Sequence, residues 1–204
     1  MALIKNRQVD SVGRRHAAQE RRNRIMASFD RPDKPNTAPS PWVERFAPLI
    51  RSAGTVLDLA SGGGRHSRYL SALGYRVVAV DIDVSGLNDL SANDNVEIIE
   101  ADLETGDWPF GERRFDGIVV TNYLHRPHLP RLVESLAPGG VLIYESFGKG
   151  NEKLGRPRNP AFLLDPAELL DAFGPRLTIV AYEHGIEEEP RPAVRQRICA
   201  VRPT

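Results

Sequence analysis

The chain has 204 residues, of which 41% are hydrophobic and 26% charged, and its formal net charge is zero. These values are ordinary for a soluble globular protein of one domain with a tail. The single cysteine, Cys199, excludes an internal disulfide and a structural zinc cluster, so we expect a reducing compartment. No apolar run approaches the ~18 residues of a membrane helix, and Ala2–Ile4 is too short for a secretory leader. The sequence therefore predicts a cytoplasmic protein with no membrane partner.

Charge is unevenly divided along the chain. Residues 1–38 carry nine Lys or Arg and four Asp or Glu, whereas the remainder carries 18 basic and 23 acidic residues. This predicts a basic N-terminal arm and linker over residues 1–38, ahead of a domain at residues 39–204. The arm is a solvated tail, a helix that docks over a ligand site, or a tether for RNA. The sequence leaves this choice and the oligomeric state open.

The first predicted element of the domain is an amphipathic helix over residues 41–52. Its apolar positions are spaced at i, i+4, i+7 and i+8, and they are Trp42, Phe46, Leu49 and Ile50. Ser40 is the expected N-cap, and Pro48 is expected to kink the last turn.

A strand, a glycine turn, a helix and a second strand follow between Thr55 and Asp83. The strand is predicted at residues 56–60, the turn at 61–64, a helix that ends at Gly74, and the next strand at 77–80, leading into Asp81. This order is the nucleotide-binding half of a βαβ unit. Glycines let the backbone approach a ligand, and the helix N-terminus offers free N–H groups. A carboxylate at Asp81 suits two ribose hydroxyls.

The remaining elements alternate until the end of the chain. We predict a short helix at 84–90 and strands at 96–100, 115–124 and 141–147. A second helix with an apolar stripe is predicted from Leu129 to Leu136. A third helix follows a capping box at 165–168, with Pro166 at its first position. Residues 137–140 end the second of these helices, and 105–114 and 148–160 are loops. Two closing strands, 177–182 and 196–201, suit an antiparallel hairpin.

These elements define the fold class. Seven strands, five of them in strict alternation with helices, predict an α/β fold with a doubly wound, mostly parallel sheet. In such sheets ligands lie at the carboxyl ends of the strands, where polar groups gather in this sequence.

The glycine turn carries a resemblance to a known family. An acid on the first strand is followed by small residues at every second position, as Asp58, Ala60, Gly62 and Gly64. This pattern resembles the first motif of class I S-adenosylmethionine-dependent methyltransferases, although most members carry Gly at the position of Ala60. The run LDLASGGGRH is similar to small bacterial enzymes related to the tellurite-resistance methyltransferases. A dinucleotide fingerprint would require Gly or Ala where Ser67 stands.

The resemblance covers residues 40–204 and implies a Rossmann-like methyltransferase fold whose last strand runs antiparallel. It also implies S-adenosyl-L-methionine as cofactor, held by Asp58, Ala60, Ser61, Gly62, Gly64, Asp81, Ile82, Asp102, Leu103 and Asn122. Asp81 would bind the ribose, Asp102 the adenine amino group, and the Leu103 N–H the ring. A cap or turn role is the alternative for Asp102, and for Asp83 a helix cap is the preferred role.

Methyl transfer requires alignment rather than a nucleophilic side chain, so a base matters only if the acceptor loses a proton. The candidate bases are Tyr123 and His125 after the fourth strand, with Tyr144 and Glu145 nearby, and no metal is implied. His66 is expected in the first turn of its helix and Cys199 in the core.

The residues at the end of the fourth predicted strand argue against one class of methyl acceptor. Residues 121–124 read TNYL rather than Asn-Pro-Pro-aromatic, which argues against methylation of adenine or glutamine amino groups. The loop at 148–160 carries four cations, Lys149, Lys153, Arg156 and Arg158. It is either a solvated loop or one that attracts a small anionic acceptor. Three alternatives stay open: an RNA methyltransferase that uses the arm, a catalytically silent cofactor-binding module, and a nicotinamide-dependent oxidoreductase.

Overall fold

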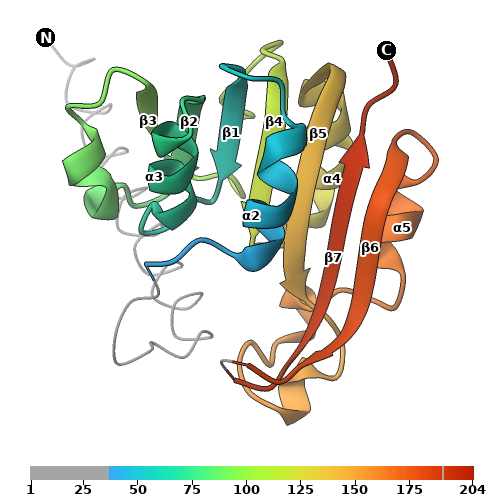
Figure 1. Ribbon diagram of the computed structural model, residues 1–204. Helices are drawn as coiled ribbons and strands as arrows, with labels where there is room; N and C mark the ends of the chain where they lie inside the picture. The colour runs from blue at the N-terminus through green and yellow to red at the C-terminus, as the bar shows by residue number, and fades with distance from the viewer. Residues whose placement is uncertain (1–36, 190) are drawn as a thin grey trace, which may run out of the picture.

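The computed structural model describes residues 37–189 and 191–204, so the predicted arm lies almost entirely outside the described residues. Seven strands form one sheet in the order β3-β2-β1-β4-β5-β7-β6 (Figure 1). The first five in this order are mutually parallel, and β7 runs antiparallel to both β5 and β6. The predicted doubly wound sheet with an antiparallel last strand is confirmed.

The strands are β1 Thr55–Leu59, β2 Arg76–Asp81, β3 Val96–Glu100, β4 Phe115–Thr121, β5 Leu136–Phe147, β6 Thr178–Glu187 and β7 Ala193–Val201. Strands β1 and β4 are apolar without alternation because both faces of the central sheet are covered. Strand β1 lies between β2 and β4, so the strand order reverses there. This reversal is where open α/β sheets bind ligands.

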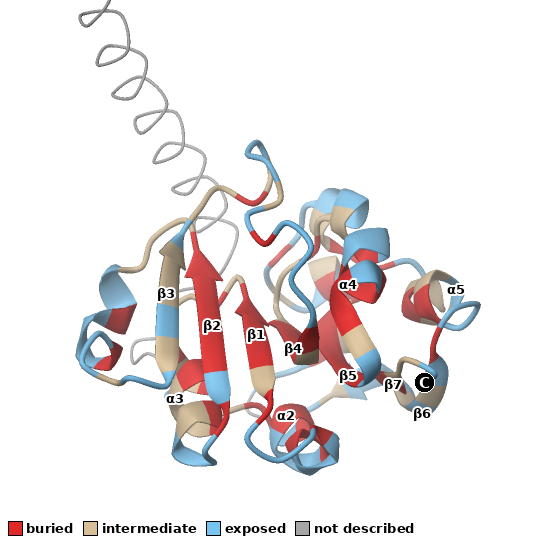
Figure 2. Cartoon of the chain, turned by 90° about the horizontal axis from the view of Figure 1, so that it is seen from above, coloured by how far each residue is buried: buried red, intermediate tan, exposed pale blue. Residues whose placement is uncertain are grey.

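The helices are α2 Pro41–Phe46, α3 Arg65–Ala72, α4 Leu129–Ser135 and α5 Glu168–Phe173, with single-turn or short 3₁₀ segments η1 Ala47–Leu49, η2 Ser85–Leu90, η3 Arg126–His128, η4 Asn151–Lys153 and η5 Pro160–Phe162. Helices α2 and α3 cover one face of the sheet, and α4 and α5 cover the other (Figure 2). None of the helices in the described part combines the length and apolar character that crossing a bilayer requires.

The first helix is shorter than predicted. Ser40 is its N-cap as expected, but α2 ends at Phe46 and continues as the 3₁₀ turn η1. Pro48 has no N–H to donate to the preceding turn, which explains the change. Three of the four predicted apolar positions are buried, whereas Leu49 is 50% exposed.

Several strand boundaries also differ from the prediction. Strand β4 ends at Thr121 because Asn122 adopts a left-handed φ of 55° and turns the chain. Strand β5 begins at Leu136, paired with Phe115, so residues 137–140 extend the strand through an irregularity. Strands β6 and β7 are both longer than predicted, and their hairpin reaches beyond the rest of the sheet (Figure 1).

The predicted strict alternation of helix and strand is wrong for the third crossover. Within the described residues β3 joins β4 through a loop without a helix, and β2 joins β3 through 3₁₀ turns. The start of α5 also differs from the prediction, because Ala167 has a left-handed φ of 62° and the helix begins at Glu168 rather than Pro166. Half of the capping box is present, since the Glu168 carboxylate accepts the Asp165 N–H at 2.7 Å.

Candidate functional site

A cavity of about 940 Å³ lies at the carboxyl ends of the central strands. Eight of the ten predicted cofactor residues line it, and these are Ala60, Ser61, Gly62, Asp81, Ile82, Asp102, Leu103 and Asn122. They come from the ends of β1, β2, β3 and β4, which are far apart in the sequence. The strand order places them together, as the sequence analysis expected.

The turn after β1 is shaped by left-handed residues at alternate positions. Ala60 and Gly62 both have a φ of 55°, and Gly64 has a φ of 77°. This conformation costs little for glycine but strains Ala60, where the chain departs from the family motif. A Cβ at Gly62 or Gly63 would meet nothing within 4 Å. Since both glycines line the cavity, the turn leaves open space against its backbone.

The other two predicted cofactor residues, Asp58 and Gly64, lie behind this turn and do not line the cavity. A Cβ at Gly64 would lie 2.3 Å from Leu87 Cδ2, so the missing side chain permits close packing. Asp58 is buried, and Oδ2 accepts a hydrogen bond from Ser67 Oγ at 2.5 Å. Burial raises the pKa of Asp58 to about 6, against the opposing effect of that hydrogen bond. Both residues support the turn.

Asp81 connects the end of β2 to the glycine turn. Its Oδ2 accepts the Gly62 N–H at 2.7 Å and its Oδ1 accepts the Asp83 N–H at 3.1 Å. The carboxylate is only 8% exposed and lines the cavity. Asp83 Oδ1 accepts the Ser85 N–H at 2.9 Å in a turn ahead of η2, whose N-cap residue is Val84 rather than the predicted Asp83.

Asp102 and Leu103 begin the loop between β3 and β4. Asp102 Oδ1 accepts the N–H groups of Glu104 and Thr105 at 2.9 and 3.2 Å, which is the turn role considered as the alternative. The Leu103 carbonyl accepts a hydrogen bond from His128 Nε2 at 2.5 Å. His128, which the sequence analysis did not identify, thereby fixes this loop. Its partner is 25 residues away, and no local pattern reveals the pairing.

Two buried hydroxyls at the cavity have no hydrogen-bond partner within the described residues. They are Ser61 Oγ and Tyr123 Oη, and both residues line the cavity. An unsatisfied buried hydroxyl costs about 1–3 kcal/mol, so a ligand that pairs with these groups would gain that energy. Together with the open glycine turn, they fit a polar, nucleoside-containing ligand such as the cofactor that the motif implies.

The two predicted catalytic residues differ in their placement. Tyr123 lines the cavity, and burial raises the pKa of its hydroxyl well above the ordinary value. His125 is not among the lining residues, and its ring centroid lies 4.6 Å from that of His128. Of the two nearby candidates, Tyr144 is buried and donates to the Tyr123 carbonyl at 2.7 Å. Glu145 lines the cavity.

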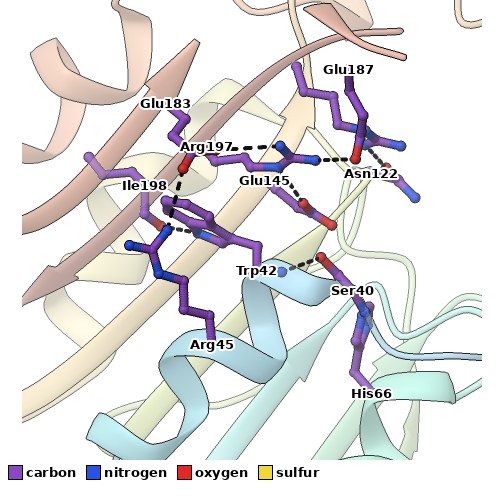
Figure 3. A network of polar contacts seen from close by, with 11 residues as sticks. Ser40, Trp42, Arg45, His66, Asn122, Glu145, Glu183, Glu187, Arg197 and Ile198 are labelled. Carbon is purple, nitrogen blue, oxygen red and sulfur yellow. Dashed lines mark hydrogen bonds and ion pairs between the residues drawn. The ribbon is translucent and has the colours of Figure 1, made fainter. Parts of the chain in front are cut away.

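His66 lies in the first turn of α3, as predicted, and connects three elements. Its Nε2 accepts the Ser40 N–H at 3.1 Å, so Nδ1 carries the proton and lies 3.3 Å from Thr121 Oγ1. The side chain is buried, which lowers its pKa to about 3 and keeps it neutral. Figure 3 shows His66 beside Ser40 at the start of α2. The ring therefore holds the entry of α2 against the end of β4.

Arg197 of β7 lies beside Glu145 (Figure 3), and these two residues line the cavity together with Arg195. Arg197 pairs with Glu145 at 3.0 Å and with Glu187 at 2.7 Å. Arg195 pairs with Glu187 at 2.8 Å, and its Nη1 donates to Asn122 Oδ1 at 2.6 Å. Because β7 runs antiparallel, its first residues reach the edge where the parallel strands end.

The cationic loop at 148–160 contributes less to the cavity than the sequence predicted. Of its four basic residues only Arg156 lines the cavity. Lys149 forms an ion pair with Asp165, and Arg158 donates to the Gly155 carbonyl at 3.4 Å. Most of the positive charge at this end comes instead from α3 and β7, whose register could not be read from the sequence.

The fold and this site resemble those of class I S-adenosylmethionine-dependent methyltransferases, in agreement with the resemblance seen in the glycine turn. Residues 56–140 match the family described as methyltransferase domain. A curated relative, protein-L-isoaspartate O-methyltransferase of Chlorobaculum parvum, is 40% identical over 97 residues. That match covers 45% of this chain and 43% of the relative, so the chain spans less than half of the relative's length.

Solved structures share the fold at low sequence identity. TehB from Haemophilus influenzae superposes with a TM-score of 0.65 and 22% identity over 80% of this chain and 61% of its own. The 1,6-didemethyltoxoflavin-N1-methyltransferase of Burkholderia thailandensis has a TM-score of 0.65 and 19% identity, covering 96% of this chain and 87% of its own. The N-methyltransferase NodS from Bradyrhizobium japonicum has a TM-score of 0.63 and 16% identity, covering 89% and 98%.

Proposed function

We propose that this protein transfers the methyl group of S-adenosylmethionine to a small molecule. The observation that carries the proposal is the cavity at the sheet reversal, where the open turn at Gly62 and Gly63 faces the buried hydroxyls of Ser61 and Tyr123. These are the features expected of a site that binds a nucleoside with an attached amino acid. The structures of the toxoflavin enzyme and NodS, both of the same fold, contain S-adenosylhomocysteine.

The cofactor-binding roles follow from the geometry of this end of the cavity. Asp81 lines the cavity and accepts a backbone N–H on each oxygen, and a carboxylate is the side chain suited to accept hydrogen bonds from two ribose hydroxyls. The Asp102 carboxylate caps its own turn, so the Leu103 backbone is the better group for the adenine ring. Asp58 and Gly64 act indirectly by supporting the turn.

Bound S-adenosylmethionine supplies an electrophilic methyl group on a sulfonium centre. The protein's part is to align the acceptor with it and to exclude water, which the enclosed, mostly apolar core around the strand ends favours. Tyr123 keeps its proton at neutral pH, so it acts as a hydrogen-bond donor or acceptor rather than as a ready base. Of the groups considered for proton removal, Glu145 has an ionisable carboxyl at the cavity, and His125 would have to act from outside the lining.

A small acceptor is supported by the 1,6-didemethyltoxoflavin-N1-methyltransferase, a protein of the same fold whose structure contains 1,6-didemethyltoxoflavin. An RNA acceptor is the second candidate, and the basic composition of residues 1–38 favours it. To separate them, the full chain is titrated with single-stranded RNA at low and moderate salt and assayed for RNA methylation. Tight, salt-sensitive binding with methylation would overturn the small-molecule proposal.

The cofactor assignment is tested by calorimetric titration of the full chain with S-adenosylhomocysteine and with NAD. We expect micromolar-range or tighter binding of the first and far weaker binding of the second. Preferential NAD binding would instead support an oxidoreductase. Cofactor binding without activity on any acceptor would support a silent binding module.

A further inference from the structure

The cavity is electrostatically divided. Its cofactor end, at β2 and the loop after β3, carries three acidic residues, Asp81, Asp102 and Glu104. The opposite end, at β5, β7 and the start of α3, is lined by Arg65, Arg156, Arg191, Arg195 and Arg197 against Glu145 and Glu187. The end that the proposed cofactor residues leave free is therefore net positive.

Arg195 is held in one orientation at this end. Its Nε and Nη1 donate to Glu187 and Asn122, and the guanidinium lies 4.3 Å from the centroid of the Phe147 ring. The side chain is 18% exposed and lines the cavity. A guanidinium has five N–H groups, so three remain for a ligand after these two hydrogen bonds. A planar donor fixed in this way suits a carboxylate.

The neighbouring charges do not cancel this preference. Glu187 is shared between Arg195 and Arg197, and Glu145 is paired with Arg197. Arg65 adds a further positive charge, because it interacts electrostatically with both Glu145 and Arg195 and donates to the Ala38 carbonyl. Arg197 also lies 3.6 Å from Glu183, which pairs in turn with Arg45. Among these seven residues the arginines exceed the glutamates by one.

The same end of the cavity also carries apolar side chains. Leu154 and Phe162, from the segment after β5 that also carries Arg156, line the cavity, as does Leu124 after β4. A ligand that fills this end would thus place a charged group at Arg195 and an apolar body against these three residues.

We propose that the methyl acceptor is a small organic acid with an apolar body, and that Arg195 binds its carboxylate. Arg197, through Glu187, is a positioning residue that holds Arg195 in place. The proposal rests on the proposed methyltransferase function, since the cofactor must occupy the other end of the cavity.

The test uses the full chain saturated with S-adenosylhomocysteine. Calorimetry compares two acids, para-hydroxybenzoate and para-aminobenzoate, with their neutral amides, which have nearly the same shape. Replacing the acid by the amide removes a charge-assisted hydrogen bond, so we expect the acids to bind about tenfold or more tightly. In Arg195→Gln this preference should fall close to onefold while S-adenosylhomocysteine still saturates the protein. The matched control is Arg176→Gln, which removes an exposed cation paired with Glu134 and should keep the preference.

Arg195→Lys guards against misfolding of the glutamine variant, because it keeps the charge and should retain part of the preference. Equal binding of acids and amides, no binding of either acid, or a preference that survives Arg195→Gln would overturn the proposal. A failure of the proposed methyltransferase function can be distinguished from a failure of this proposal, because the unmodified chain would then not bind S-adenosylhomocysteine at all.

Discussion

Asp81 performs a structural and a proposed ligand-binding role with one carboxylate. It accepts two backbone N–H groups, from Gly62 and Asp83, and lines the cavity beside the glycine turn. Asp81→Ala should weaken S-adenosylhomocysteine binding by about 1–3 kcal/mol, because a charged acceptor to the ribose is lost. Calorimetry measures the affinity, and the exposed Asp94→Ala serves as the control. Unchanged affinity in Asp81→Ala would refute the ribose assignment.

His66 makes stability depend on pH in a direction that can be worked out. Its pKa is about 3 in the folded protein and about 6.5 when unfolded, so the unfolded chain binds more protons as the pH falls below 6.5. Its contribution to stability is present above pH 6.5 and is lost progressively toward pH 3. Asp58, whose pKa is raised to about 6, acts oppositely and gains stability as the pH falls from 6 toward 3.8.

Replacing His66 isolates its share of this dependence. Between pH 7 and pH 5 the His66 term costs about 2 kcal/mol of unfolding free energy. His66→Gln lacks this loss. Its unfolding free energy at pH 5, relative to that at pH 7, should therefore be about 2 kcal/mol higher than in the unmodified chain. Denaturant titrations at the two pH values measure it. The same pH dependence in both proteins would show that His66 is not held neutral.

At the scale of elements, the turn after β1 contains two adjacent glycines with different roles. A Cβ at Gly64 would lie 2.3 Å from Leu87 Cδ2 on a left-handed backbone, whereas a Cβ at Gly63 meets nothing within 4 Å. Gly64→Ala should therefore lower the melting temperature with little direct effect on the ligand. Gly63→Ala should keep the melting temperature and weaken S-adenosylhomocysteine binding, because the methyl group occupies the cavity.

The matched pair is measured by thermal unfolding and calorimetry on both variants. Equal effects of the two substitutions on stability and on affinity would contradict the division of roles between Gly63 and Gly64.

The start of the loop between β3 and β4 is held by a contact with a distant residue. His128 Nε2 donates to the Leu103 carbonyl, and its ring packs 5.0 Å from Trp108. Without this contact the loop that presents Asp102 and Leu103 is less restrained. His128→Ala should speed amide hydrogen exchange over residues 101–106 and weaken S-adenosylhomocysteine binding, whereas His125→Ala should change neither. Unaltered exchange in His128→Ala would exclude this role.

Patterns of neighbouring residues correctly predicted those elements whose structure depends on residues close together in the sequence. Strand β3 has the predicted bounds, the glycine turn and Asp81 lie at the cavity, and the Ser40 cap is present. Contacts between distant segments could not be read in the same way. The arginines of β7 reach the site only through its antiparallel register with β5, and His66 and His128 bind backbone groups more than twenty residues away. For the same reason the sequence assigned the cavity's positive charge to the wrong loop.

At the scale of the whole molecule, the order of the strands separates the proposed cofactor residues from the proposed acceptor residues. Except for Asn122 at the end of β4, the proposed cofactor residues lie on or just after β1, β2 and β3, whereas the ends of β4 and β5 with the start of β7 carry the proposed acceptor residues. Helices on both faces bury the strand interiors, so the site forms on an edge whose position the core fixes (Figure 2). Substitutions at one end should therefore alter one ligand's affinity and leave the other's nearly unchanged.

The antiparallel course of β7 has a consequence for engineering this protein. The second half of the strand, through Ile198, Cys199 and Ala200, is packed in the interior, while Arg195 and Arg197 line the cavity. A single strand therefore contains a buried anchor and a cavity-lining segment within nine residues. Libraries that randomise residues 191–197 would explore new acceptors while the anchor keeps the hairpin in register.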